Sequence, residues 1–225
     1  MNIQKNNSIF FLTIYILMEK FNTDLSKQEL INTFGYGYYE DWKGYEYDAE
    51  QEIVESCIKP FYNENYSVME IGCGGGKWTL NYLSPNFKKI YALDVIPCVM
   101  SLKTNIQYIE LNEKDFYCTN IEDNSIDFIW SFGTFCHFSV FACEEYMSNI
   151  YKKLKPNGKG VIMFANWPRN FKYKNYWTKT DIYSQHGNWY YNDEKYTIEM
   201  LTKLKYKNIK DLLPNFRDSL IYFEK

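Results

Sequence analysis

Residues 68–76 read Val68-Met69-Glu70-Ile71-Gly72-Cys73-Gly74-Gly75-Gly76. The start of this stretch is mostly apolar and predicts a short strand, while the pattern from Lys77 to Leu83 predicts a helix. The glycines between them permit positive φ angles and a close approach of the backbone to a ligand. A helix that follows such a turn directs free N–H groups toward an anionic group. The stretch therefore predicts a strand, a ligand-binding loop and a helix, in that order.

Asp94 is the second informative residue, because it ends the next predicted strand, Lys89 to Leu93. An acid about twenty residues after a glycine loop is placed to accept hydrogen bonds from both ribose hydroxyls of a nucleotide. The alternative is that Asp94 caps a helix that begins near Pro97. The glycine loop upstream favours the ribose role. The acid Glu70 argues against a dinucleotide fingerprint, which more often reads GxGxxG without an acid before it.

Short apolar runs alternate with helical segments from residue 67 onward. Strands that alternate with helices are typical of a parallel sheet covered on both faces, so the predicted fold class is α/β. The further elements that we expect are strands at 106–111, 126–130 and 160–164, helices at 140–154 and 196–205, and a closing hairpin of 209–213 with 220–223. We also expect residues 156–158, Pro-Asn-Gly, to stop the first of these helices.

No linker, repeat or low-complexity tract interrupts the sequence, so we expect a single domain over residues 1–225. Its expected parts are a helical N-terminal extension or lid at 1–66, a ligand-binding core at 67–164, a substrate-side insertion at 165–192, and a C-terminal helix and hairpin at 193–225.

Taken together, the motifs resemble those of class I S-adenosylmethionine (SAM)-dependent methyltransferases. The resemblance runs in order over residues 67–165 and rests on Glu70 to Gly76, Asp94, Lys114-Asp115-Phe116, residues 123–131 and residues 154–160. It implies a Rossmann-like sheet of seven strands, mostly parallel, with an antiparallel last strand and helices on both faces. It also implies SAM as the cofactor, bound by the core at 67–164.

The same resemblance implies which residues contact SAM. The loop glycines would underlie its methionine part, and the acid before them would help hold the ammonium group through the loop. The acid after the second strand would bind the ribose, an acid–aromatic pair would meet the adenine edge, and the end of the fourth strand would lie beside the sulfonium. The expected cofactor-binding residues are Glu70, Gly72, Cys73, Gly74, Gly76, Trp78, Asp94, Val95, Asp115, Phe116, Ser131 and Phe132.

Gly133 departs from the family pattern, because many relatives carry a polar or acidic residue just past the fourth strand. His137 lies four residues further on, and a neutral imidazole there can remove a proton from a substrate hydroxyl. We therefore expect His137 to be the catalytic base. The alternatives are that it caps the helix that begins near Val140 or packs in the core.

Five residues are candidates for the substrate site. Arg169 follows the fifth strand and Arg217 lies at the closing hairpin; each could clamp a phosphate or carboxylate, or instead form a surface ion pair. His186, in the insertion, would line the pocket or lie exposed in a loop. Tyr39 and Trp42 belong to an aromatic run that would form a lid excluding water, or pack the N-terminal helices on the sheet.

The composition indicates which class of substrate and which cellular compartment to expect. The net charge is −3 and the lysines are spread among acids, so we expect no nucleic-acid substrate, because phosphate binding needs a concentrated basic surface. The six cysteines show no CxxC and no metal-ligand spacing, so we expect no metal site and a reducing, cytoplasmic location. The apolar run from Ile9 to Met18 is too short to span a bilayer, and we expect a packed helix there, with a membrane-surface or partner contact as the alternative.

These observations favour a methyltransferase that acts on a small molecule. The two arginines favour O-methylation of a sugar, a phosphorylated or another anionic metabolite, and the chain resembles methyltransferases of bacterial surface-polysaccharide and capsule pathways, including phosphoramidate modification. One alternative is an N-methyltransferase of a small amine, with the tyrosines as a cation cage. Two others are a non-catalytic SAM-binding protein and an NAD-dependent reductase. Nothing in the sequence indicates the oligomeric state.

Overall fold

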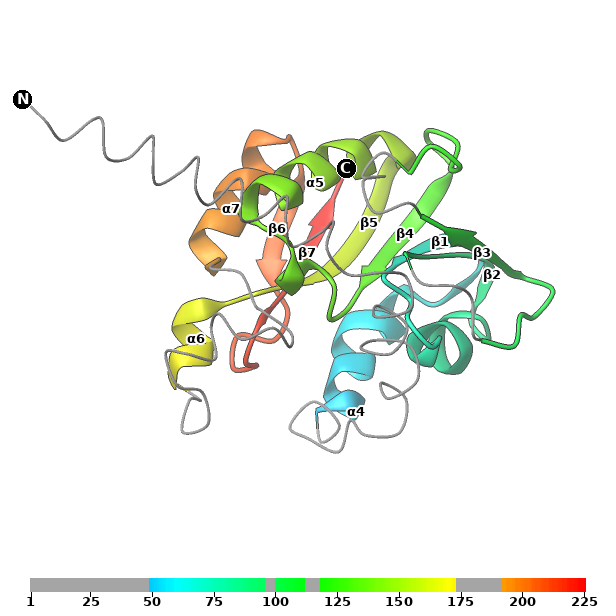
Figure 1. Ribbon diagram of the computed structural model, residues 1–225, viewed down its shortest axis with the longest axis horizontal. Helices are drawn as coiled ribbons and strands as arrows, with labels where there is room; N and C mark the ends of the chain where they lie inside the picture. The colour runs from blue at the N-terminus through cyan, green and yellow to red at the C-terminus, as the bar shows by residue number, and fades with distance from the viewer. Residues whose placement is uncertain (1–48, 96–99, 112–117, 173–191) are drawn as a thin grey trace, which may run out of the picture.

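The computed structural model describes residues 49–95, 100–111, 118–172 and 192–225 (Figure 1). Several predicted features lie outside these residues: the N-terminal helices with Tyr39 and Trp42, the acid–aromatic pair Asp115 and Phe116, and His186.

The described residues form one seven-stranded sheet with the strand order β3-β2-β1-β4-β5-β7-β6. Strands β1 to β5 pair in parallel, and β7 runs antiparallel to both β5 and β6. This arrangement confirms the predicted Rossmann-like sheet with an antiparallel last strand. The strands are β1 (Asn63–Ile71), β2 (Phe87–Asp94), β3 (Ile106–Glu110), β4 (Ile126–Ser131), β5 (Leu154–Phe164), β6 (Lys207–Asp211) and β7 (Ser219–Glu224).

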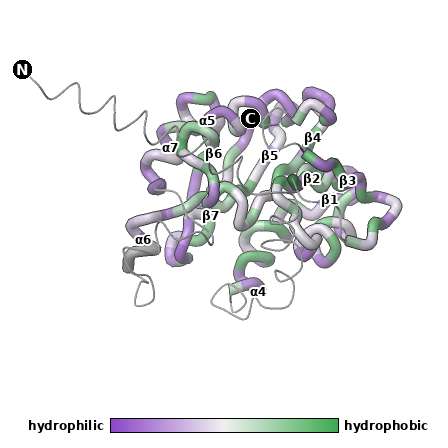
Figure 2. The backbone as a smooth tube through the Cα atoms, in the orientation of Figure 1, coloured by the Kyte–Doolittle hydropathy of each residue, from purple (hydrophilic) through white to green (hydrophobic). Residues whose placement is uncertain are grey.

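Helices cover both faces of this sheet, as Figure 1 shows. One face is covered by α4 (Glu50–Ile53), the π-helical turns η2 (Val54–Ile58) and η4 (Thr79–Leu83), and the other by α5 (Val140–Lys153) and α7 (Glu194–Lys203). Both hydrophobic and hydrophilic residues occur along α5 and α7, as expected of amphipathic helices (Figure 2). The remaining short helices are η3 (Lys59–Phe61), η5 (Phe135–His137) and α6 (Trp167–Lys172).

Each face of the sheet has its own buried apolar cluster. Because side chains alternate along a strand, Val68 and Phe128 pack under α4 and η2, while Met69 and Ile129 pack under α5. Adjacent residues of β1 and β4 therefore belong to different clusters. This pattern explains why the central strands read as continuous apolar runs in the sequence.

β5 differs from its prediction. It begins at Leu154, directly after α5, and it includes the Pro-Asn-Gly segment that was expected to stop the preceding helix. Asn157 has a φ of 63°, and the pairing of β5 with β4 shifts register between the pairs Ile126↔Leu154 and Phe128↔Lys159. The turn-forming residues therefore make an irregularity inside the strand, where a proline is tolerated.

Candidate functional site

The glycine loop leaves β1 and lies against the carboxyl end of β2. Gly72, Gly74 and Gly76 have φ angles of 73°, 50° and 87°, a region that residues with a side chain rarely adopt. The N–H groups of Gly72 and Cys73 both donate to the carbonyl oxygen of Leu93, at 2.8 and 3.1 Å. The predicted positive-φ loop is confirmed, and these two bonds fix it to the end of β2.

The three glycines differ in what surrounds them. A Cβ atom on Gly72 would lie 1.8 Å from Oγ1 of Thr134, and one on Gly76 would lie 3.0 Å from the side chain of Met100. A Cβ atom on Gly74 would meet no described atom within 4 Å. Close packing thus requires two of the glycines, whereas the described residues leave the Cβ position of Gly74 open.

Asp94 ends β2 with its carboxylate directed at this loop. Oδ2 accepts a hydrogen bond from the N–H of Gly74 at 2.7 Å, and Oδ1 accepts one from the N–H of Val95, also at 2.7 Å. The carboxylate and the open face of Gly74 are therefore side by side, as a site for a ribose requires. The alternative capping role near Pro97 lies outside the described residues.

Glu70 lies beneath the loop, in the core. Its side chain is buried and its Oε2 accepts a hydrogen bond from the hydroxyl of Thr79 on η4. Burial raises the pKa of the Glu70 carboxyl to about 8; the bond from Thr79 opposes this rise, and the negative charge of Asp94 adds to it. Glu70 thus joins β1 to the helix after the loop.

Two hydroxyl groups from the end of β4 hold the start of the glycine loop. Oγ of Ser131 donates to the carbonyl oxygen of Ile71 at 2.7 Å, and Oγ1 of Thr134 donates to the same oxygen at 3.2 Å. Ser131 is fully buried, so its hydroxyl serves the loop. Thr134 could not be predicted from the sequence, because a lone threonine after a strand belongs to no binding pattern.

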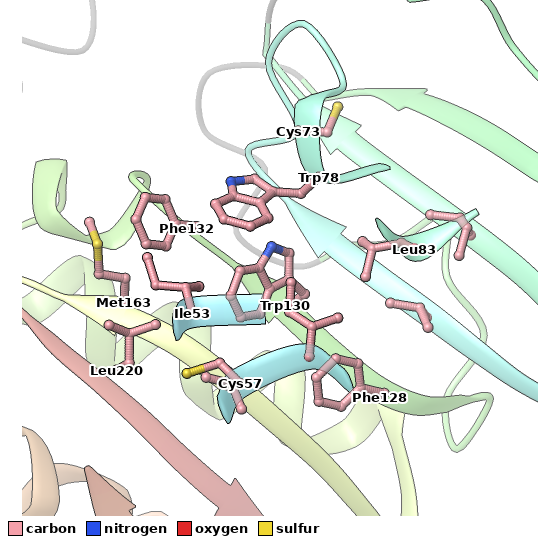
Figure 3. Packing of buried hydrophobic residues seen from close by; sticks show 14 of the residues in the cluster. Ile53, Cys57, Cys73, Trp78, Leu83, Phe128, Trp130, Phe132, Met163 and Leu220 are labelled. Atoms are coloured by element: carbon pink, nitrogen blue, oxygen red, sulfur yellow. The ribbon is translucent and has the colours of Figure 1, made fainter. Parts of the chain in front are cut away.

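An aromatic cluster lies on the same side of the sheet, beneath the loop (Figure 3). The ring of Trp78 is 5.3 Å from that of Trp130 and 5.0 Å from that of Phe132, measured between centroids. The indole N–H of Trp130 has no hydrogen-bond partner among the described residues, and its nitrogen lies on the side of the ring that faces Trp78. Trp78, expected at the cofactor, is thus mostly a core residue.

His137 ends the turn η5, which follows β4 at the carboxyl edge of the sheet. Its backbone N–H donates to the carbonyl oxygen of Thr134 at 3.0 Å. The cap of α5 is Ser139, whose hydroxyl accepts from the N–H of Ala142 at 3.1 Å. The alternative in which His137 caps this helix is therefore wrong, and its place at the ligand edge agrees with the expectation.

The two arginines have different surroundings. The guanidinium of Arg169 forms ion pairs with Asp211, at 2.6 Å, and with Glu194. These carboxylates lie on β6 and α7, so Arg169 joins the elements at the C-terminal edge of the sheet. An external anion would have to displace two carboxylates, which argues against the anion-binding role expected for this residue.

Arg217 lies in the turn between β6 and β7, beside the end of β4. Its Nε donates to the buried carboxylate of Asp218 at 2.8 Å, and the ring of the preceding residue, Phe216, lies 6.3 Å from that of Phe132. Burial raises the pKa of the Cys136 thiol, Asp218 raises it further and Arg217 lowers it, so both charges lie close to η5. The ion pair with Asp218, which was the alternative to an anion-binding role for Arg217, is therefore present.

Two further findings concern the described residues alone. No helix among them has the length and apolar character needed to cross a membrane. No group of three or more His, Cys, Asp or Glu side chains in these segments could hold a metal ion.

Comparison with known proteins identifies related chains. A family model described as a methyltransferase domain matches residues 44–208. An uncharacterized methyltransferase-like protein of Schizosaccharomyces pombe is 34% identical over 98 residues, which cover 43% of this chain and 37% of that protein. A second uncharacterized methyltransferase of this yeast is 33% identical over 119 residues, or 52% and 46% of the two chains. The chain thus spans less than half the length of these curated relatives.

Solved structures share the fold at low sequence identity. A SAM-dependent methyltransferase from Archaeoglobus fulgidus has a TM-score of 0.61 and 14% identity, covering 84% of this chain and all of that one. The N-methyltransferase NodS from Bradyrhizobium japonicum, in complex with S-adenosylhomocysteine, has a TM-score of 0.60 and 16% identity, covering 88% and 97%. These likenesses support the assignment of the fold.

Proposed function

We propose, since this chain belongs to the methyltransferase domain family, that it uses SAM as its methyl donor and methylates a small anionic acceptor. The observation that carries the proposal is the meeting of Asp94 with the open face of Gly74, joined by a hydrogen bond of 2.7 Å. A carboxylate beside an accessible loop backbone suits a ligand with both a ribose and an amino-acid part. SAM has both parts.

The residues around this point suit methyl transfer by in-line displacement. SAM supplies a methyl group activated by its sulfonium, which departs as a neutral thioether and keeps the electron pair of the broken bond. The loop and Asp94 would hold the donor, so that the reaction depends on positioning and on a site closed to water. Phe132 and Phe216, both largely buried, would exclude water at the end of β4.

A hydroxyl acceptor must also lose its proton. His137 is the group that we propose as the base, since it lies on the turn after β4 and its neutral imidazole can take a proton from an oxygen as the C–O bond forms. The proton would then pass to solvent. An acceptor that is already ionised at the reacting oxygen would not need His137.

Arg217 supports an anionic acceptor. The bond from its Nε to Asp218 fixes the orientation of the guanidinium, and the ring of the preceding Phe216 packs against Phe132, so Arg217 lies near the end of β4. A fixed guanidinium favours phosphate or carboxylate. We therefore propose O-methylation of a sugar, a phosphorylated or another anionic metabolite; a capsule or phosphoramidate substrate is the most specific form of this proposal.

N-methylation of a small amine is the second candidate. The sequence is rich in tyrosine, and aromatic faces attract cations. NodS, which shares the fold, is an N-methyltransferase. An amine acceptor must lose its ammonium proton before it can attack the methyl group. The two candidate functions therefore differ in the class of compound that the protein would methylate, amines or anionic metabolites.

The cellular setting is also a proposal. The five described cysteines are free and buried, which suits a reducing compartment such as the cytoplasm. We propose a small-molecule acceptor and not a nucleic acid. A nucleic-acid substrate needs a concentrated basic surface, whereas the lysines are spread along the sequence among acids. The division into an N-terminal lid, a SAM-binding core, an insertion and a C-terminal hairpin likewise remains a prediction.

Calorimetric titration of the purified protein tests the donor. Micromolar binding of SAM and S-adenosylhomocysteine, without binding of NAD, is the expected result. Folded protein that binds neither would contradict the proposal, and binding of NAD alone would support the reductase. Transfer of labelled methyl groups to sugar phosphates or to amines, measured with the same preparation, then separates the two candidate acceptors.

A further inference from the structure

Thr134 is the residue at which the glycine loop meets the turn that carries His137. Its hydroxyl donates to the carbonyl oxygen of Ile71, the last residue of β1, at 3.2 Å. Its own carbonyl oxygen accepts the backbone N–H of His137 at 3.0 Å. One residue therefore contacts both the segment proposed to hold the methyl donor and the segment proposed to hold the base.

The fit between Thr134 and Gly72 is close. Oγ1 of Thr134 occupies the position that a Cβ atom on Gly72 would take, since the two would be only 1.8 Å apart. Gly72 is held from the opposite side by the bond from its N–H to Leu93 on β2, at 2.8 Å. The first glycine of the loop is thus confined between β2 and the segment after β4.

The carbonyl of Ile71 is also the acceptor for Ser131. A carbonyl oxygen has two lone pairs, so it can accept both hydroxyls at once. Ser131 belongs to β4 itself and is fixed by the sheet, whereas Thr134 follows Gly133, whose φ of 77° turns the chain over the loop. Thr134 is therefore the member of the pair whose position depends on the turn after β4.

We infer that Thr134 is a positioning residue for the methionine part of SAM. The inference rests on the proposed function, because it assumes that the loop from Gly72 to Gly76 underlies that part of the donor. The Thr134 hydroxyl sets the position of Gly72 relative to β4, and thereby the position of the donor relative to His137. The ribose site at Asp94 is held by separate bonds, from Gly74 and Val95.

This separation gives a selective test. S-adenosylhomocysteine has the amino-acid part, whereas 5′-methylthioadenosine has the same adenosine but lacks it. Thr134→Val keeps the shape of the side chain and removes the hydroxyl, and Thr134→Ser keeps the hydroxyl. We expect Thr134→Val to lower the affinity for S-adenosylhomocysteine about three- to tenfold, as for the loss of one hydrogen bond. The affinity for 5′-methylthioadenosine should stay within about twofold of the wild-type value. Thr134→Ser should bind both ligands as the wild type does.

Calorimetric titration of the full chain with each ligand measures these constants. The matched control is Thr202→Val, which removes a hydroxyl that donates to the carbonyl of Ile198 on the exposed face of α7, at 2.7 Å. Equal weakening of both ligands by Thr134→Val, unchanged binding of S-adenosylhomocysteine, or a Thr134→Ser variant as weak as Thr134→Val would each overturn the inference. Wild-type protein that binds neither ligand would overturn the proposed function, and this inference with it.

Discussion

Glu70 is a buried acid whose proton should make the stability of the protein depend on pH. Its pKa is about 8 in the folded protein, against 4.5 when unperturbed, so the folded state holds a proton that the unfolded state releases between these values. The free energy of unfolding should therefore fall as pH rises from about 5 to 8, by at most about 1.4 kcal/mol per pH unit from this group. Glu70→Gln should remove this contribution, measured by urea unfolding at several pH values.

The same series includes its own control. Asp123 is an exposed acid whose pKa is lowered mainly by its bond from Lys153, so Asp123→Asn should leave the fall between pH 5 and 8 unchanged. Identical slopes for wild type and Glu70→Gln would contradict the assignment of this proton to Glu70.

His137 can be separated from the donor site by a single substitution. His137→Ala should lower the rate of methyl transfer to a hydroxyl acceptor about 10²- to 10⁴-fold, because it removes the proposed general base. The affinity for SAM should stay within about twofold of the wild type, because Asp94 and the glycine loop are unchanged. Steady-state kinetics and calorimetry measure the two quantities. Unchanged turnover would remove His137 from the mechanism.

Single residues differ in how far the sequence predicts them. Asp94 and Gly74 could be placed together because both belong to a local pattern that links a strand end to a glycine turn. Thr134 could not, because its role depends on a contact with Ile71 that lies 63 residues away. The partners of Arg169 could not be predicted for the same reason, since Asp211 and Glu194 are distant residues that no local pattern indicates.

At the scale of elements, Arg169 holds α7 and β6 to the end of β5. The Asp211 side chain is only 3% exposed, so removing its cation leaves a carboxylate that water hardly reaches. Arg169→Met should lower the free energy of unfolding by about 3 kcal/mol, as for other broken buried pairs. Chemical unfolding measures this. Lys203→Met, which breaks an exposed pair with Glu144, should cost less than about 1 kcal/mol, and equal losses would contradict the argument.

The bounds of a helix or strand could be predicted from the sequence where its apolar periodicity and its flanking residues agree. The helix expected at 140–154 is α5, Val140–Lys153, because its apolar period and its flanking residues agree. β1 begins at Asn63 rather than at Val68, because its polar first half is held by pairing with β2, which the sequence of β1 alone does not indicate. β5 begins early for a similar reason: Leu154 pairs with Ile126 of β4, and the Pro-Asn-Gly segment lies in the register shift between that pair and Lys159.

For the whole molecule, ligand binding should appear as added stability. A ligand that binds only the folded state stabilises it by about 2.7 kcal/mol at a hundredfold excess over its dissociation constant. We therefore expect S-adenosylhomocysteine to raise the melting temperature by several degrees, in a calorimetric scan, and NAD to leave it unchanged. Asp94→Ala should abolish most of the shift. A shift that survives this substitution would place the ligand elsewhere.

The strand order carries a consequence for how the protein is made. β1 and β4 are neighbours in the sheet, yet the bond from Ser131 to Ile71 closes a separation of 60 residues along the chain. Bringing such distant segments together has an entropic cost, and domains rich in long-range pairings fold slowly. A nascent chain that has emerged only as far as β3 already contains the whole glycine loop and Asp94, but neither hydroxyl that holds the Ile71 carbonyl. During translation, the ability to bind the cofactor should therefore arise late and abruptly, once β4 has left the ribosome.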